Sequence, residues 1–571
     1  MAIADDISRP WIKSYPSDIG WDAPVSTTPV HEQVLSTCAR MPDSVALDFL
    51  GKKTSYGELA KAINTFAGAL QSQFGITKGS RVALLLPNTP FYAIAYYGVL
   101  RAGGTVVNCN PLYTVAELTH IVGNSGTDVV VTLDLKQMLE KAETLVEAGH
   151  IKSLIVCHFP DALPGLKSLL YRVAKRKDLG DLKTSKVRDR ITRFADLMHR
   201  NDTPAPVSID PANDVAVQQY TGGTTGIPRG AMLSHANIAA NANQARVWFA
   251  RVFVPGSRGI AVLPFFHIFA MTTCLNVPLS SGMTMFLMPR FELKAFIDLL
   301  QRSGATLLPA VPTLISALVR SAAATPEILS GLDVVVSGGA SLPNEVRTEF
   351  ARKSKAQLIE GYGLTEASPV VCAGPLDGLN KPLSIGLPFP ATDIRLFDVD
   401  RNEVAAIGER GEVQVKGPQV MLGYYDNPEA TKDAFMDGWL RTGDVAYMDA
   451  DGYVFLVDRI KDLIICSGFN VYPRTIEEAL SQHPAVEENN VIGVPDEYRG
   501  EAPVAFVKLR EGKTATAAEL KKYLADKLNK IEMPREIIFK DQLPKTLIGK
   551  LSKKELREEY AARKETKSEP A

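Results

Sequence analysis

Short apolar runs alternate with amphipathic stretches along the first part of the chain. Strands are expected at 82–86, 105–107, 129–133 and 154–156, and helices between them at 91–102 and 116–125. Strands of this length separated by helices are typical of βαβ units with a largely parallel sheet. A second βα series begins near Val215 and continues through the apolar run at 334–336. The pattern therefore predicts a large α/β domain.

The pattern changes after about residue 394. Short strands punctuated by glycine follow as far as Tyr453, which predicts a small β-rich subdomain. Beyond Arg459 the sequence resembles a compact α+β unit. We therefore expect an amino-terminal domain over 1–460 and a small, mobile carboxy-terminal α+β domain over 461–571.

Two helices have recognisable starts. Ser55 and Glu58 have the spacing of a capping box, and so do Thr516 and Glu519. In a capping box the hydroxyl and the carboxylate each accept a hydrogen bond from the other residue's backbone N–H. Helices are therefore predicted directly after Ser55 and Thr516.

Composition narrows the classes of function. The 571 residues are 46% hydrophobic and 22% charged, as in an ordinary globular protein of several domains. With 63 basic and 64 acidic residues the net charge is −1, so no partner nucleic acid is expected and any anion must be bound locally.

Six scattered cysteines argue against a disulfide scaffold or a zinc site. The start lacks a secretory pattern and prolines interrupt the uncharged stretch 259–289, which favours a cytoplasmic chain with buried strands there.

The segment YTGGTTGIPRG at 220–230 contains four glycines and three threonines, the densest cluster of turn-forming residues in the chain. It lies between a predicted strand and a helix that starts after Ser234. Glycine N–H groups can close around phosphate oxygens, threonine hydroxyls add donors, and an arginine can meet the charge. The segment lacks Walker A spacing, and a flexible surface loop is the alternative interpretation. The residues predicted to bind phosphate are Thr221, Gly222, Gly223, Thr224, Thr225, Gly226 and Arg229.

A basic segment covers 164–193. Within it Leu166, Leu169, Leu170 and Val173 have the spacing of one helical face, and the cations around them are Lys167, Arg172, Lys175, Arg176 and Lys177. A basic amphipathic helix of this kind can bind an anionic membrane surface reversibly. The alternative is a solvated helix whose leucines pack on the parent domain.

The loop at 220–230 resembles the phosphate-binding signature of the adenylate-forming superfamily of acyl-CoA synthetases, peptide-synthetase adenylation domains and luciferases. Matching motifs follow in order: LPFFHIFA at 263–270, SGGASLP at 337–343, EGYGLTEASP at 360–369, GWLRTGDVA at 438–446, DRIKDLIICSGFNVYP at 458–473 and PKTLIGK at 544–550. The segments RPWIKSYP, VVNCNPLYT and KGPQVMLGYY most resemble bacterial long-chain fatty-acid–CoA ligases. The resemblance therefore covers nearly the whole chain.

This resemblance implies ATP-dependent ligation of a fatty acid, expected to be long-chain, to coenzyme A through an acyl-adenylate, with release of AMP and pyrophosphate. Two alternatives stay open. One is an adenylation enzyme that loads a carrier protein, and the other is a non-catalytic lipid- or nucleotide-binding protein that assists fatty-acid uptake.

The resemblance also implies which residues bind ATP and Mg²⁺. Glu366 would hold Mg²⁺ with the Thr225 hydroxyl, and Thr365 would face the α-phosphate. Asp444 would accept hydrogen bonds from the ribose hydroxyls, and Arg459 would add a further contact. The residues expected around the adenine and the rest of the nucleotide are Gly339, Ala340, Glu360, Gly361, Tyr362 and Gly363.

By the same resemblance, Lys550 would be the catalytic lysine of the adenylation step. His267 would lie beside the substrate carboxylate and the acyl pocket. The apolar residues near His267 suit either the wall of an acyl tunnel or ordinary core, and they are Phe265, Phe266, Phe269, Met271 and Leu275.

Lys461 would be the hinge between the two domains. Two positions depart from the usual motifs: Arg229 replaces a lysine, which predicts altered handling of pyrophosphate, and Arg474 replaces an uncharged polar residue. The thioester step with coenzyme A is expected to involve Ser467, Gly468 and Phe469.

The expected partners are a fatty acid and coenzyme A, with ATP and Mg²⁺, in the cytoplasm and reversibly at the inner face of the membrane. The sequence leaves open the acyl chain length, because pocket depth depends on which side chains meet at its floor. It also leaves open the oligomeric state, a homodimer included.

Overall fold

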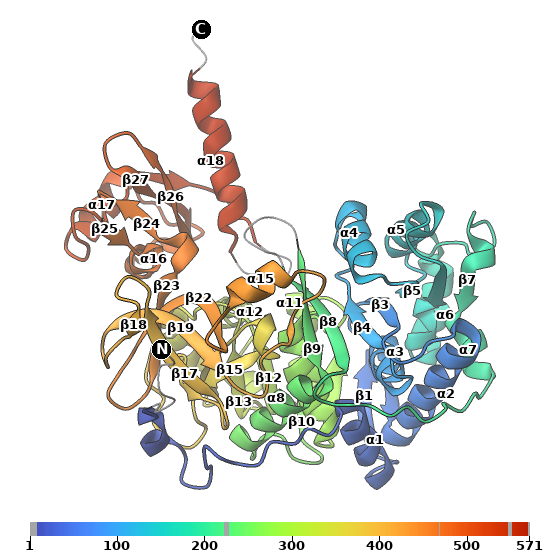
Figure 1. Ribbon diagram of the computed structural model, residues 1–571. Coiled ribbons are helices and arrows are strands. Elements are labelled where there is room, and N and C mark those ends of the chain that lie inside the picture. Colours follow the sequence, from blue (N-terminus) through green and yellow to red (C-terminus); the bar gives the residue numbers. More distant parts are fainter. Residues whose placement is uncertain (1–7, 222–227, 468, 546–550, 569–571) are drawn as a thin grey trace.

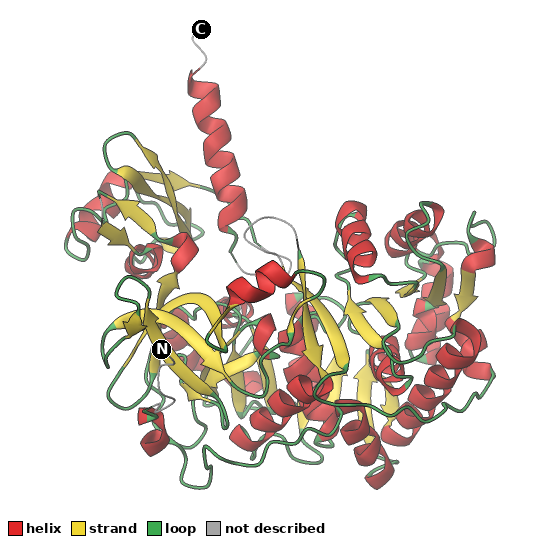
Figure 2. Ribbon diagram, viewed as in Figure 1, coloured by secondary structure: helices red, strands yellow, loops and turns green. Residues whose placement is uncertain are grey.

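The computed structural model describes residues 8–221, 228–467, 469–545 and 551–568. Its larger, amino-terminal part contains two mainly parallel sheets with helices around them, and an antiparallel sheet follows (Figures 1 and 2). A smaller α+β part, drawn in red in Figure 1, forms the carboxyl end. This α/β architecture confirms the predicted fold class.

The first sheet contains the strands of the first predicted βα series. Its inner strands are buried and pair in parallel, as continuous apolar runs favour. In spatial order the sheet consists of β20 (Gly423–Tyr424), β9 (Arg229–Ser234), β8 (Val215–Thr221), β4 (Thr105–Asn108), β3 (Arg81–Leu85), β5 (Val129–Leu133), β6 (Ser153–Cys157) and β7 (Ile191–Arg193).

The second sheet is parallel at its centre and has antiparallel edges. It holds the later βα series and both strands of the uncharged stretch at 259–289. In spatial order it consists of β16 (Leu387–Pro388), β15 (Val370–Ala373), β14 (Gln357–Gly363), β13 (Val334–Ser337), β12 (Leu307–Ala310), β10 (Arg258–Ala261), β11 (Thr284–Leu287), β1 (Val45–Phe49) and β2 (Lys52–Ser55).

The predicted β-rich subdomain forms the third sheet, in which neighbouring strands run antiparallel. Its strands are β17 (Asp393–Asp398), β18 (Glu403–Val404), β19 (Arg410–Lys416), β21 (Phe435–Met436), β22 (Trp439–Met448) and β23 (Val454–Arg459). The carboxy-terminal sheet contains β24 (Ile464–Cys466), β25 (Phe469–Val471), β26 (Val486–Asp496), β27 (Gly500–Leu509) and β28 (Glu536–Phe539).

Separate hydrophobic cores support the two-part organisation. The large core extends along the chain as far as Val454, and the cores of the carboxy-terminal part begin at Ile464. A short 3₁₀ turn, η7 (Ile460–Asp462), connects the two parts. The change of core thus lies on either side of Lys461, the proposed domain boundary.

Helices cover the sheets and begin where the sequence indicates. Both predicted capping boxes form: the Glu58 N–H donates to the Ser55 hydroxyl at 3.1 Å, and the Glu519 N–H donates to the Thr516 hydroxyl at 3.2 Å. The helices are α1 (Val30–Arg40), α2 (Tyr56–Phe74), α3 (Pro90–Arg101), α4 (Val115–Ser125), α5 (Lys136–Glu147), α6 (Gly165–Ala174), α7 (Phe194–His199), α8 (His235–Trp248), α9 (Ile268–Ala270), α10 (Val277–Ser280), α11 (Leu293–Ser303), α12 (Pro312–Arg320), α13 (Pro326–Leu329), α14 (Asn344–Lys353), α15 (Pro428–Ala434), α16 (Pro473–Ser481), α17 (Ala517–Ala525) and α18 (Lys553–Ser568).

Two local expectations change. The phosphate loop was expected between a strand and a helix, but an additional strand, β9, lies between the loop and α8, so the loop joins the antiparallel strands β8 and β9. The basic segment forms α6 as predicted, yet none of the residues of this helix is buried. The alternative in which its leucines pack on the domain is therefore wrong. Among the described residues, no helix has both the length and the apolar character needed to cross a bilayer.

Candidate active site

A cavity of about 590 Å³ opens at the carboxyl ends of β13 and β14. Ligands of parallel α/β sheets commonly bind at this edge, because the loops that follow the strands converge there. The lining comes from both large sheets, from the β-rich subdomain and from η7. Predicted site residues that line it are Thr221, Arg229, His267, Gly339, Gly361, Tyr362, Gly363, Thr365, Glu366, Asp444, Arg459 and Lys461.

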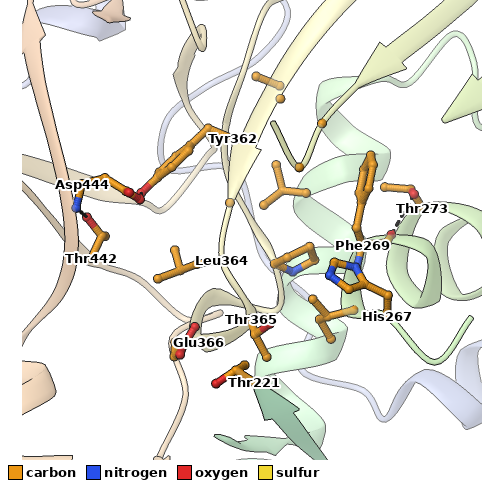
Figure 3. A pocket seen from close by; sticks show the side chains of 18 of the residues that line it. Thr221, His267, Phe269, Thr273, Tyr362, Leu364, Thr365, Glu366, Thr442 and Asp444 are labelled. Carbon is orange, nitrogen blue, oxygen red and sulfur yellow. Dashed lines mark hydrogen bonds between the residues drawn. The ribbon is translucent and has the colours of Figure 1, made fainter. Parts of the chain in front are cut away.

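At one end of the cavity an aspartate is held by two donors, and Figure 3 shows one of them, Tyr362, beside Asp444. The Tyr362 hydroxyl donates to Asp444 Oδ2 at 2.6 Å, and Arg459 Nε donates to Asp444 Oδ1 at 2.9 Å. Burial raises the pKa of the Tyr362 hydroxyl well above its ordinary value, so this group stays a donor. Each carboxylate oxygen keeps a further lone pair for another donor, such as a sugar hydroxyl.

The part of β22 that carries Asp444 is braced by an ion pair that sequence reasoning missed. Arg441 Nε donates to the buried Glu412 carboxylate at 3.0 Å, and the Gly443 N–H donates to the same carboxylate at 3.2 Å. Arg441 lies in the quoted motif GWLRTGDVA, whereas Glu412 lies on β19 and only strand pairing brings it here. These contacts fix the backbone of β22 at Gly443, whose φ of 71° is strained for residues with a side chain.

Glu360 has a supporting position and is not part of the cavity wall. Its buried carboxylate pairs with Arg347 and accepts a hydrogen bond from the Leu342 N–H at 3.2 Å. Burial raises the pKa of the Glu360 carboxyl. The carboxylate therefore holds the segment that follows Gly339 against β14. Ala340, in the same segment, also lies outside the lining.

The middle of the cavity holds the residues predicted to contact phosphate and metal. Glu366 Oε1 accepts a hydrogen bond from the Tyr424 hydroxyl at 2.8 Å, and Arg229 lies 5.7 Å from the centre of the same tyrosine ring. Thr221 and Thr365 lie beside Glu366 (Figure 3). Tyr424 thus fixes an acidic and a basic side chain at the same wall. Its segment, KGPQVMLGYY, carried the family resemblance, so a signal for it existed in the sequence.

These residues fit a magnesium ion that is bound mainly by a substrate. Within the ranges that the structure describes, no group of three or more His, Cys, Asp or Glu is arranged to hold a metal ion. Mg²⁺ needs only one or two protein carboxylates when phosphate oxygens complete its shell. Glu366, oriented by Tyr424, can supply such a carboxylate. Thr225, the other predicted ligand, lies outside the described residues.

The other end of the cavity is apolar and begins at His267. The Phe269 N–H donates to His267 Nδ1 at 3.3 Å, so a neutral ring carries its proton on Nε2. The apolar residues of the lining include Ala245, Phe249, Phe253, Phe269, Pro309, Val370, Ala373 and Phe389. Of the five apolar residues named near His267, only Phe269 lines the cavity, and Phe265, Met271 and Leu275 are fully buried core.

Aromatic side chains from separate segments meet in this apolar end. The ring centre of Phe249 lies 6.3 Å from that of Phe253 and 6.3 Å from that of Phe389. Phe249 directly follows α8, Phe253 lies four residues further along the chain, and Phe389 directly follows β16. The cavity therefore joins a polar end to an apolar end at His267 and Thr365.

Several predicted residues lie outside the described residues. They are Gly222, Gly223, Thr224, Gly226, Gly468 and Lys550, together with Thr225. Of the predicted thioester residues, Ser467 and Phe469 lie at the turn between β24 and β25, and both are exposed. The Ser467 N–H donates to the Arg499 carbonyl at 2.7 Å.

Arg474 connects the two parts of the molecule. Its N–H donates to Asp458 Oδ2 at 2.9 Å, and its Nη1 donates to the Leu456 carbonyl at 2.9 Å. Both acceptors belong to β23, whereas Arg474 belongs to α16. The unusual arginine therefore contacts the domain connection. Lys461 lines the cavity at the same connection, where burial lowers the pKa of its ammonium group.

Ion pairs also join the surfaces of the two parts. Arg510, the residue after β27, pairs with Glu345 of α14. Glu487 of β26 pairs with Arg320 of α12 at 3.2 Å and with Lys508 at 2.9 Å. These contacts hold the carboxy-terminal part in the orientation of Figure 1.

The chain belongs to the family of AMP-binding enzymes. Residues 34–425 match the AMP-binding enzyme family, and residues 475–550 match the AMP-binding enzyme C-terminal domain. The chain is 39% identical to the long-chain-fatty-acid–CoA ligase of Bacillus subtilis (strain 168), across 96% of this chain and 98% of that protein. It is 38% identical to the ligase of the same name from Yersinia pestis, across 97% and 98% of the two chains.

The fold of this chain is also similar to that of a solved structure. The ATP-bound crystal structure of MatB from Rhodopseudomonas palustris has a TM-score of 0.81 and 30% sequence identity, and the match covers 93% of this chain and 99% of that one. The resemblance to the adenylate-forming superfamily, and to its bacterial long-chain ligases in particular, is thus confirmed.

Proposed function

We propose that this protein is an ATP-dependent fatty acyl-CoA ligase. The observation that carries the proposal is the two-ended cavity: Asp444, Arg459 and Glu366 line its polar end, and phenylalanines line its apolar end. A nucleotide suits the first end and an alkyl chain the second, so a carboxylate would meet the α-phosphate between them. The long-chain names of the relatives support an acid of similar length here.

The reaction has two steps. A carboxylate oxygen of the acid attacks the α-phosphorus of ATP, and the bond to pyrophosphate breaks. The thiol sulfur of coenzyme A then loses its proton and attacks the acyl carbonyl, and AMP leaves with the carboxylate oxygen still bound to phosphorus. Mg²⁺, when bound, neutralises phosphate charge during the first step.

Each of several residues of this chain would have its own role in the reaction. Asp444, held by Tyr362 and Arg459, would bind the ribose. Arg229 would meet phosphate charge in place of the usual lysine. His267 Nε2–H would donate to the substrate carboxylate, and Glu366 would hold Mg²⁺. Because a carboxylate is already ionised at neutral pH, no general base is needed.

Lys550 is proposed as the cation that stabilises the first step, with Ser467, Gly468 and Phe469 serving the second step after rotation about Lys461. Lys550→Ala should slow adenylation about 10²- to 10³-fold, the cost typical of losing one preorganised donor. Thioester formation from synthetic acyl-adenylate should change little. Equal loss in both half-reactions would contradict this role.

The test of the function uses the full-length enzyme with ATP, Mg²⁺ and palmitate. Without coenzyme A, mass spectrometry should detect enzyme-bound palmitoyl-AMP, and added coenzyme A should convert it to palmitoyl-CoA. Turnover with acids from C4 to C18 then defines the chain length. An adenylate that coenzyme A does not consume would favour carrier loading, and no adenylate would favour a binding protein.

We further propose that the enzyme acts in the cytoplasm and binds reversibly to the inner face of the membrane, where long-chain acids partition. Sedimentation of the purified protein decides whether it is also a homodimer.

A further inference from the structure

Helix α6 is attached to its domain along one side. The Tyr171 ring packs against the Phe159 ring with centres 5.0 Å apart. Lys167 Nζ donates to the Leu50 carbonyl at 2.7 Å, and Arg172 pairs with Asp161 at 2.6 Å. Successive helical positions turn by about 100°, so Tyr171 lies opposite the stripe that Leu166, Leu169, Leu170 and Val173 form.

That stripe faces solvent. Leu166 is 73% exposed, Leu169 61%, Leu170 57% and Val173 75%. Single exposed apolar residues are ordinary, but four on one helical face form a contiguous patch. These four side chains remain in contact with water, so the patch has the composition of a surface that another phase or molecule covers.

Cations lie directly beside the stripe. Lys175, Arg176 and Lys177 follow the last turn of the helix, and all three are exposed. Lys175 lies 3.7 Å from Asp178, whereas Arg176 and Lys177 form no ion pair with any described residue. Further exposed cations of the same segment are Lys183, Lys186, Arg188 and Arg190. The charge next to the apolar stripe therefore complements an anionic partner.

We propose that α6 is the surface on which this protein docks to an anionic lipid bilayer. The leucines would enter the boundary between headgroups and acyl chains, and the cations would contact lipid phosphates. This inference rests on the proposed membrane binding and assigns it to one helix. The stripe lies on a helix of which no residue is buried, and insertion into a bilayer requires such exposure.

The position of α6 suits this role. In Figure 1 it lies at the far side of the amino-terminal part from the carboxy-terminal part. A molecule docked through α6 would leave its smaller part free to change orientation during the two steps of catalysis.

The test measures co-sedimentation of the full chain with vesicles of phosphatidylglycerol and phosphatidylcholine in equal parts, at low and high salt. The wild-type protein should bind these vesicles at low salt, less at high salt, and only weakly to phosphatidylcholine alone. Substituting Lys175, Arg176 and Lys177 by Glu should lower the partition coefficient at least about 10-fold. Leu169→Gln combined with Leu170→Gln should lower it similarly.

A matched control carries the same change of charge on the carboxy-terminal part, by substitution of the exposed Lys522, Lys527 and Lys554 with Glu. This control should bind vesicles like the wild type. AMP release with soluble octanoate, measured without vesicles, should be unchanged in the α6 variants, so loss of docking is distinguished from loss of the proposed ligase activity. No vesicle binding at low salt, equal binding by the α6 variants, or a dimer that the leucine variant dissociates would overturn the proposal.

Discussion

The Tyr362 hydroxyl donates a hydrogen bond to the Asp444 carboxylate across 2.6 Å, although 82 positions separate the two residues. Tyr362 belongs to β14 of a large mixed sheet, and Asp444 belongs to β22 of the β-rich subdomain. The contact therefore fixes the aspartate relative to the cavity that both sheets line. It makes the buried Asp444 carboxylate an oriented acceptor.

Removing this contact should weaken ATP binding. Tyr362→Phe deletes the donor and lets the carboxylate rotate, so we expect the KM for ATP to rise about 10-fold, with a smaller change in kcat. Tyr453→Phe is the matched control, because the Tyr453 hydroxyl donates to the Leu379 carbonyl outside the cavity. Isothermal titration with ATP checks the effect directly. Equal ATP affinity in Tyr362→Phe and the wild type would contradict the assigned role.

Substitution of Phe249 should lengthen the preferred acid. Phe249→Val removes a ring that meets Phe253 and Phe389 at the apolar end of the cavity. We expect kcat/KM for long relative to medium-chain acids to rise about 10-fold, as one or two extra methylenes in an apolar pocket are worth. Phe296→Val, at a buried site of α11 that does not line the cavity, controls for lost stability. If both variants give the wild-type chain-length profile, Phe249 does not limit the pocket.

Local signals predicted much of this structure. The strands at 82–86 and 129–133 were recognisable because buried parallel strands are continuous apolar runs, and the helix after Ser55 was recognisable because its cap is local. Tyr362 and Asp444, which line the cavity, were predicted because each lies in a motif. The aromatic end of the cavity was not predicted from the sequence, because Phe249 and Phe389 meet only through tertiary packing.

Sequence patterns also do not predict what contacts a surface. Periodicity placed Leu166 and Leu170 on one helical face, but periodicity does not tell which neighbour covers a face. The ion pairs of Glu345 and Glu487 with the carboxy-terminal part were also beyond reach, because they depend on how two separately folded parts meet.

These ion pairs should influence domain orientation. Glu345→Arg places a cation against Arg510 and should move a fluorescence-labelled carboxy-terminal part away from its observed orientation. The swap Glu345→Arg with Arg510→Glu should restore that orientation. The fluorescence signal of the two single variants and of the swap gives a double-mutant cycle for the orientation of the carboxy-terminal part. Because the pair is partly exposed, we expect a coupling free energy between the two substitutions of only about 1 kcal/mol. Additive effects of the two substitutions would show that the pair does not hold the parts together.

Restricting the connection should separate the two half-reactions. Lys461→Pro locks φ within η7 and removes a backbone freedom that a rotating hinge uses. We expect acid-dependent exchange of pyrophosphate into ATP to persist while formation of acyl-CoA falls at least about 10-fold. Lys461→Ala, which keeps backbone freedom, should retain both. Unchanged half-reactions in Lys461→Pro would locate the hinge elsewhere.

The central claim is that a carboxylate attacks the α-phosphorus of ATP, and an oxygen label tests it most directly. Palmitate carrying ¹⁸O in its carboxylate is incubated with the enzyme, ATP, Mg²⁺ and coenzyme A, and the nucleotide product is analysed by mass spectrometry. The account predicts AMP that contains one ¹⁸O atom, in an amount equal to the palmitoyl-CoA formed. Unlabelled AMP, or ADP with labelled phosphate, would contradict it.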